Sequence, residues 1–62
     1  MIEEYAAKMM NKAAVVCVRS NYDEELMGFV TSYEEFRSLW PSAEITGIDD
    51  EDAAFGEITV YC

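Results

Sequence analysis

Four consecutive acidic residues near the end of the chain form its densest group of chemically active side chains, in a sequence that has no histidine. We call them the acidic tetrad: Asp49, Asp50, Glu51 and Asp52. Carboxylates transfer protons, bind metal ions or present negative charge to a basic partner. The spacing of the acids, and the elements that hold them, decide among these roles.

The acidic tetrad resembles the start of a calcium-binding loop. Such a loop needs oxygen ligands at alternate positions, a glycine at the sixth and a glutamate at the twelfth. Counted from the first acid, the fifth, sixth and twelfth places hold Ala53, Ala54 and Val60. Counting from Asp50 fails as well, because Ala54 then takes the fifth position. We expect no specific metal site and no cofactor, with weak nonspecific binding of divalent ions as the alternative.

Catalysis lacks its usual components in this sequence. A nucleophile such as Cys17 or Ser32 has no histidine to act as its base. Paired carboxylates for glycoside chemistry need a cleft that so small a domain can hardly build. The sequence therefore predicts a protein that is not an enzyme and has no catalytic residues.

Length and composition indicate one folded domain, residues 1–62, with a core that buries only about 60% of the surface of the unfolded chain. A hydrophobic fraction of 52% is too high for a disordered acidic tail. Thirteen acidic residues oppose four basic ones, so the net charge is −9 and the chain repels itself at neutral pH. We expect this charge to serve a partner outside the chain.

The start of the sequence is acidic where a signal peptide has a basic region followed by an apolar run. No apolar stretch approaches the roughly 18 residues of a membrane span. We therefore expect a cytoplasmic protein without membrane contact. In that compartment Cys17 and Cys62 are expected to be free thiols, with Cys17 a small core residue.

Apolar spacing predicts a helix and a hairpin in the first half of the chain. Residues 2–12 have helical periodicity, with acids in the first turn and lysines later. Residues 13–19 form a β-branched apolar run, which predicts a strand. A polar turn leads to a second strand, Leu26–Val30, in which Gly28 marks a bulge or a close contact.

A second helix and a second hairpin follow. Ser32 and Glu35 have the spacing of a capping box, and Pro41 ends the helix that they start. The side chains expected to face the sheet are Phe36, Leu39 and Trp40. Two further strands are predicted at Glu44–Ile48 and Glu57–Cys62, with the acidic tetrad in their connection.

The resulting order, α-β-β-α-β-β, predicts an α+β fold: a single two-layer domain in which an antiparallel sheet carries two helices on one face. A terminal strand at a sheet edge is able to pair across a dimer axis. The protein is therefore expected to be a monomer or a homodimer.

Charge is concentrated in the second half of the chain. Residues 1–31 carry a net charge of −2, and residues 32–62 carry −7. We expect these acids to gather into one acidic ridge, with aromatic side chains as apolar anchors. The predicted partner-binding residues are the acidic tetrad (Asp49, Asp50, Glu51 and Asp52), Glu34, Glu35, Glu44, Glu57, Tyr33, Phe55 and Tyr61.

Direct binding to nucleic acid is excluded by charge, because affinity for DNA and RNA comes largely from neutralising phosphates with Lys and Arg. The same physics favours the reverse case, in which carboxylates occupy the basic channel of a nucleic-acid enzyme. The expected partner is a basic nucleic-acid-binding protein. The plainer interpretation of the acidic tetrad is a solvated turn between two strands.

The size, charge and α+β layout resemble those of the small acidic inhibitors that phages and mobile elements use against host nucleic-acid enzymes. The segment GFVTSYEEFRSLW, residues 28–40, is similar to a strand-cap-helix segment of the smaller uracil-DNA glycosylase inhibitors. The resemblance implies a noncatalytic inhibitor in the cytosol of a host bacterium. The first expected target is a Cas effector, in which case the protein would be an anti-CRISPR that acts as a DNA mimic. The second is a uracil-DNA glycosylase. The competing hypothesis is a small interaction module or regulatory subunit that binds through an apolar sheet edge rather than through its charge.

Overall fold

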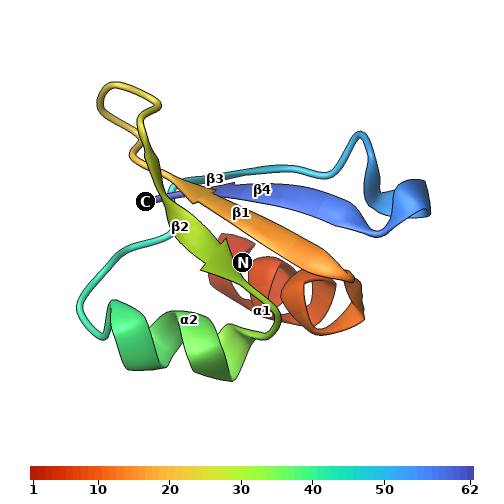
Figure 1. Ribbon diagram of the computed structural model, residues 1–62. Helices are drawn as coiled ribbons and strands as arrows, with labels where there is room; N and C mark the ends of the chain where they lie inside the picture. The colour runs from red at the N-terminus through yellow and green to blue at the C-terminus, as the bar shows by residue number, and fades with distance from the viewer.

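The chain follows the predicted order of elements, with one short addition, in a computed structural model that describes residues 1–62 (Figure 1). The elements are α1 (Ile2–Lys12), β1 (Val15–Arg19), β2 (Leu26–Val30), α2 (Tyr33–Leu39), β3 (Gly47–Asp49), the 3-10 helix η1 (Ala53–Phe55) and β4 (Glu57–Tyr61). The third strand is shorter than predicted, because residues 44–46 have no regular structure. Neither helix is long and apolar enough to cross a membrane.

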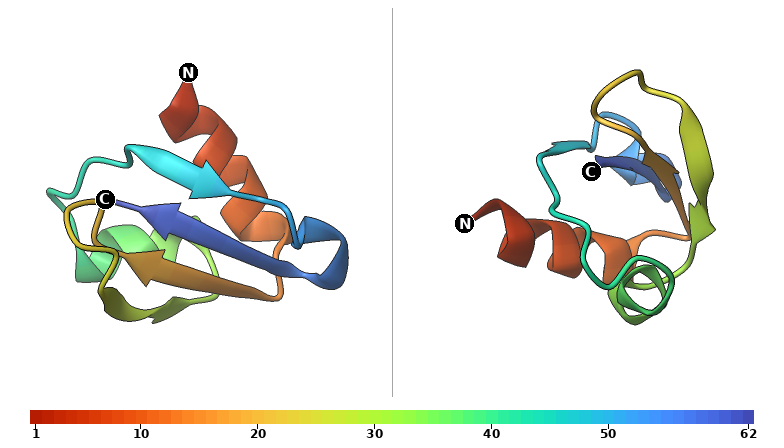
Figure 2. Two further views of the ribbon diagram at one scale, coloured as in Figure 1. Left: turned by 90° about the horizontal axis from the view of Figure 1, so that it is seen from above. Right: turned by 90° about the vertical axis from the view of Figure 1, so that its left-hand side faces the viewer.

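The four strands form one mixed sheet in the order β2-β1-β4-β3 (Figure 2, left). β1 pairs with β4 in parallel, and the two outer pairs are antiparallel. The predicted α+β fold is confirmed and two of the three strand pairs are antiparallel as predicted, but the central pair is parallel. Figure 1 shows the reason: α2 carries the chain back below the sheet before β3 begins, so the second hairpin returns with β4 running beside β1 in the same direction.

The place of the terminal strand also differs from the prediction. β4 lies inside the sheet, between β1 and β3, and offers no free edge for a dimer. Its side chains explain this position. Ile58 and Val60 are both buried, whereas β3 contributes a glycine, a half-buried isoleucine and an exposed aspartate. The more apolar strand takes the centre of the sheet, where burial stabilises it most.

Both helices cover the same face of the sheet, as predicted (Figure 2, right). The core between the layers consists of Ala6, Met10, Val16, Val18, Val30, Phe36, Ile45, Ile58 and Val60. Cys17 is not part of it, because side chains alternate along a strand and the buried neighbours Val16 and Val18 face the helices. The prediction that Cys17 is a core residue is therefore wrong.

Trp40 joins α2 to the sheet edge. A Cβ atom placed on Gly28 would lie only 3.2 Å from Cη2 of Trp40, so Gly28 is the close-contact point that the sequence predicted. The register between β1 and β2 also shifts between Val18 and Arg19, next to this contact. Leu39 was expected to face the sheet but is 56% exposed. The helix ends at this residue, and the ring of Trp40 takes the position against the sheet.

Gly56 closes the second hairpin in a conformation that favours glycine. Its φ is +82°, and an added Cβ would lie 3.1 Å from the Cβ of Ala14. The carbonyl of Gly56 also accepts hydrogen bonds from the backbone N–H groups of Ala14 and Val15, at 2.8 and 3.0 Å. We expect Gly56→Ala to lower the free energy of unfolding by about 1–3 kcal/mol in urea titrations, because a left-handed backbone strains any other residue.

A matched control for this substitution is Gly47→Ala. Gly47 has no positive φ, and its nearest neighbour would lie 3.7 Å from the added Cβ, which is ordinary contact. The control should change the free energy of unfolding by much less than Gly56→Ala. Equal losses in the two variants would show that the left-handed conformation does not limit stability.

Candidate acidic binding surface

The acidic tetrad lies at the tip of the β3–β4 hairpin, as predicted. Asp49 ends β3, and the next three acids form the turn that leads into η1. The turn is closed by its own groups, since Oδ1 of Asp49 accepts a hydrogen bond from the N–H of Glu51 at 3.0 Å. All four acids are exposed. The tip therefore presents a run of carboxylates on a short, locally braced turn.

One hydrogen bond connects the tip to the helical layer. The hydroxyl of Tyr5, on α1, donates to Oδ2 of Asp50. This bond raises the pKa of Tyr5 above its ordinary value of 10.0, because it favours the protonated hydroxyl. The single salt bridge of the protein joins Arg37 to Glu3, so no basic side chain pairs with the acidic tetrad. Its charge is uncompensated within the chain.

A hollow of about 100 Å³ lies beside the acidic tetrad on the sheet face without helices. Its lining consists of Val15, Cys17, Phe29, Asp49, Asp52, Glu57, Ile58 and Thr59. Strand register explains the mixture: Cys17 lies opposite Phe29 on one side and Thr59 on the other, and Thr59 lies opposite Asp49. This cross-strand row runs from an aromatic side chain at the β2 edge to a carboxylate at the β3 edge.

The hollow thus has apolar and anionic walls, which suit a lysine or arginine side chain with its aliphatic stem and charged head. Val15, Cys17 and Phe29 were not among the residues predicted for this surface. Alternation along each strand would have placed Val15 and Cys17 together on one face. The strand order was also needed, because only the parallel pairing of β1 with β4 brings them beside Glu57.

Two further predicted residues share the end of the sheet that carries the tip. Phe55 is 79% exposed in η1, and Glu57 begins β4 and lines the hollow. Glu34 and Glu35 lie in the first turn of α2, after the end of β2. Two strands, β1 and β4, lie between β2 and β3. The first turn of α2 follows β2, so it lies at the other edge of the sheet from the tip.

Glu35 has a structural role at this helix start. The N–H of Glu35 donates to Oγ of Ser32 at 3.0 Å, which is one half of the predicted capping box. Its carboxylate accepts from the N–H of Thr31 at 2.7 Å, one residue earlier than in the standard motif. Glu35 is therefore engaged in the cap, whereas Glu34 is exposed and its carboxylate makes no hydrogen bond within the protein.

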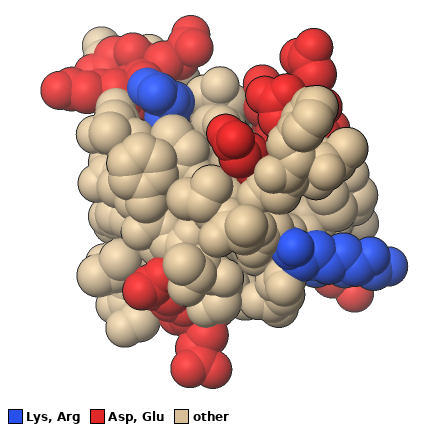
Figure 3. Space-filling view, turned by 45° about the vertical axis from the view of Figure 1, so that its right-hand side comes forward, with Lys and Arg blue, Asp and Glu red and all other residues tan.

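The remaining predicted residues, Glu44 and Tyr61, lie at the opposite end of the sheet. Tyr61 pairs with Gly47 at the start of β3, and Glu44 precedes that strand. The β1–β2 turn, with Asp23, Glu24 and Glu25, lies at this end too, since Asn21 donates to Thr46 at 2.8 Å. The acids thus do not form one ridge: Figure 3 shows several acidic groups that uncharged surface separates from one another.

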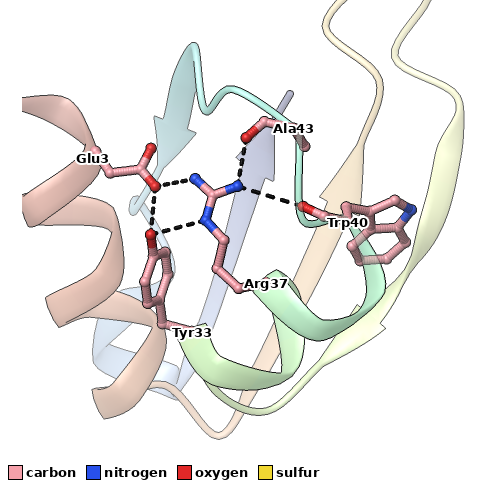
Figure 4. Close-up of polar contacts among 5 residues, drawn as sticks. All are labelled: Glu3, Tyr33, Arg37, Trp40 and Ala43. Atoms are coloured by element: carbon pink, nitrogen blue, oxygen red, sulfur yellow. Dashed lines mark hydrogen bonds and ion pairs between the residues drawn. The ribbon is translucent and has the colours of Figure 1, made fainter.

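Tyr33 is half-buried, and its hydroxyl is engaged in a hydrogen-bond network within the protein (Figure 4). Its hydroxyl donates to Oε2 of Glu3 at 2.6 Å and accepts from Nε of Arg37 at 2.9 Å. Nη1 of Arg37 also donates to the carbonyl of Ala43 at 2.6 Å. This network joins α1, α2 and the segment after α2. Glu3 and Arg37, which are 34 positions apart in the chain, were not among the predicted site residues.

The network predicts a pH-dependent contribution to stability. The hydrogen bonds from Tyr33 and Arg37 lower the pKa of Glu3 below its ordinary value of 4.5. A lowered pKa means that the folded state favours the carboxylate, so the contribution is complete above pH 4.5 and is lost as the pH falls through the folded-state pKa. We expect Glu3→Gln to cost up to about 1 kcal/mol at neutral pH, since the pair is partly exposed.

Urea titrations at several pH values check this expectation. The difference between the wild type and Glu3→Gln should shrink as the pH falls below 4.5. Glu4→Gln removes the same charge from the same helical turn without touching the network, so it should leave the pH profile of stability nearly unchanged. A difference that persists at low pH would contradict the assigned role of the carboxylate.

Metal and thiol chemistry find little support in the arrangement. No group of three or more Cys, Asp or Glu side chains is placed to hold a metal ion. Cys17 and Cys62 are free thiols, as predicted. Burial raises the pKa of Cys62, which keeps it in the poorly nucleophilic thiol form at neutral pH.

Known proteins were compared with the chain by family, by sequence and by structure. No family model, curated protein or solved structure matches it. The chemistry of the surface follows from its geometry: exposed carboxylates at a braced tip, and beside them a hollow with apolar and anionic walls.

Proposed function

We propose that the protein is a noncatalytic acidic inhibitor that occupies the nucleic-acid-binding surface of a basic enzyme in a bacterial cytosol. The most specific form of the proposal is a phage-type anti-CRISPR that acts on a Cas effector as a DNA mimic. A uracil-DNA glycosylase is the next target class. The observation that carries the proposal is the uncompensated run of exposed carboxylates in the acidic tetrad.

Charge complementarity gives such a tip a physical function. Enzymes that bind nucleic acids neutralise phosphates with Lys and Arg, and a carboxylate is able to accept the same hydrogen bonds and charge. Complementary potentials also speed the encounter of two proteins and discriminate against other partners. The hollow beside the tip adds a place where the stem of a partner's lysine or arginine is buried against apolar side chains.

Cas effectors fit this surface better than glycosylases on one point. They read a short duplex motif with arginines in the major groove and hold the guide–target duplex in a positively charged channel. A run of carboxylates at one corner of a small domain suits a localised pair of arginines. Glycosylases instead bind a flipped base in a closely fitting pocket, and the exposed aromatic side chain of Phe55 beside the tip keeps them as the next target class.

A pull-down from a nuclease-treated bacterial lysate that carries CRISPR effectors tests the proposal. We expect the tagged protein to capture a basic nucleic-acid enzyme, and we expect duplex DNA and rising salt to displace it. Mass spectrometry then distinguishes a Cas effector from a glycosylase. Capture of a partner that is indifferent to DNA and salt would overturn the proposal.

A further inference from the structure

The β2 edge of the sheet is unprotected, unlike the opposite edge. β2 is five residues long, Leu-Met-Gly-Phe-Val, and contains neither a charged residue nor a proline. β3, at the other edge, has three residues and ends in Asp49. Edge strands are usually protected by charges, prolines or short length, because one row of their N–H and C=O groups has no neighbour. β2 leaves such a row open.

Apolar side chains accompany this open row. Leu26, Met27 and Phe29 are 46, 40 and 60% exposed, which is unusual for three of the five residues of a strand. The strand is also held in place, because the Trp40 ring packs against Gly28 from the helical side. A fixed strand with exposed apolar side chains is able to bind an extended segment at little cost in ordering.

Acidic residues at both ends of β2 decide what kind of segment fits. Asp23, Glu24 and Glu25 directly precede the strand, and Glu34 and Glu35 follow it closely. In an antiparallel pair of two β2 strands, the acids before one strand would face the acids after the other. Two copies of the chain, each with a net charge of −9, would therefore repel one another at both ends of the paired strands.

We infer that β2 binds an extended segment of a partner protein as an added strand, and that this segment is apolar in its centre and carries Lys or Arg at both ends. Backbone hydrogen bonds and the exposed apolar side chains supply affinity, and the acids at the two ends select for cations. The open backbone row of β2 and the acidic tetrad lie at opposite edges of the sheet, although the ring of Phe29 lines the same hollow as Asp49 and Asp52.

A synthetic peptide of alternating valine and threonine, with paired lysines at each end, provides the probe. We expect it to shift the backbone amide resonances of residues 26–30 and to change the fluorescence of Trp40, the only tryptophan. A peptide with glutamates in place of the lysines should not bind. A lysine-flanked peptide with N-methyl groups along one edge should lose binding, because it is unable to form the strand hydrogen bonds. This comparison uses the unaltered protein.

A matched pair of variants locates the site. Leu26→Lys places a cation in the β2 edge, and we expect it to weaken binding of the peptide by roughly tenfold, or about 1.4 kcal/mol. Leu39→Lys makes the same change at a comparably exposed leucine on α2 and should leave affinity within about twofold. Neutralising the acidic tetrad should also leave peptide binding at β2 intact, so this inference and the proposed function are able to fail separately.

Three results would overturn the inference. The first is equal binding of the N-methylated peptide, which would show that charge alone holds it. The second is equal weakening by Leu26→Lys and Leu39→Lys. The third is a dimer of the free protein in sedimentation that Leu26→Lys dissociates, which would make a second copy the occupant of the edge.

Discussion

Neutralising the acidic tetrad (D49N/D50N/E51Q/D52N) is expected to weaken binding to the target enzyme at least roughly a hundredfold and to abolish inhibition at working concentrations. Each of the four carboxylates is exposed and lacks a basic partner within the chain. Even ~0.7 kcal/mol per contact, within the range for exposed ion pairs, amounts to about 3 kcal/mol for the set. Titration of the captured enzyme by calorimetry and a cleavage assay measure the two effects.

The substituted tip should keep its fold. An amide oxygen is able to accept the hydrogen bonds that Asp49 and Asp50 accept from Glu51 and Tyr5. Removing four negative charges also reduces the self-repulsion of the chain. An unfolding midpoint at or above that of the wild type would therefore assign any loss of binding to charge at the tip.

A control variant removes the same charge from the other end of the sheet. Asp23, Glu24, Glu25 and Glu44 lie at that end, and D23N/E24Q/E25Q/E44Q has the same net charge of −5 as the tip variant. We expect this control to slow association somewhat and to leave inhibition largely intact. Equal losses in both variants would show that overall charge, rather than the tip, drives the interaction.

Local signals in the sequence predicted most of the elements correctly. The first helix has the predicted bounds, 2–12, because apolar periodicity and the distribution of charged residues agree there. Ser32 is the N-cap of α2, since its hydroxyl accepts from the N–H three residues on. Gly28 is a close-contact point because an added Cβ would lie 3.2 Å from the ring of Trp40. Each of these features depends on neighbours within a few positions, or on one residue type.

Strand order and long-range pairs were beyond such signals. The sequence has two hairpins, and either strand of the second hairpin was able to pair with β1. Because β4 is the strand that pairs with β1, Cys17 lies beside Thr59 and β4 lies inside the sheet. The same pairing places Glu44 at the other end of the sheet from the acidic tetrad. Nothing local indicates that Glu3 comes within reach of the Tyr33 hydroxyl.

Phe36→Ala is the substitution expected to cost the most stability, about 3–5 kcal/mol. Phe36 is fully buried, and its ring lies 5.7 Å from the Trp40 ring and 6.3 Å from the Tyr33 ring, measured between centroids. The guanidinium carbon of Arg37 lies 5.2 Å from the centre of the Phe36 ring. Removing the ring therefore leaves a cavity and loosens the contacts that hold α2 against both α1 and the sheet.

A domain of this length has only about 3–9 kcal/mol of total stability, so the substitution removes most or all of it. We expect loss of the near-ultraviolet circular dichroism signal and of a cooperative urea transition at 25 °C. Leu39→Ala, three residues further along the same helix and 56% exposed, should change the free energy of unfolding by only about 0.5 kcal/mol. A Phe36→Ala protein that unfolds cooperatively at nearly wild-type urea would contradict the central place of this ring. Because Trp40 packs both on this ring and on Gly28, the same variant should also release β2, the strand to which we assign partner binding.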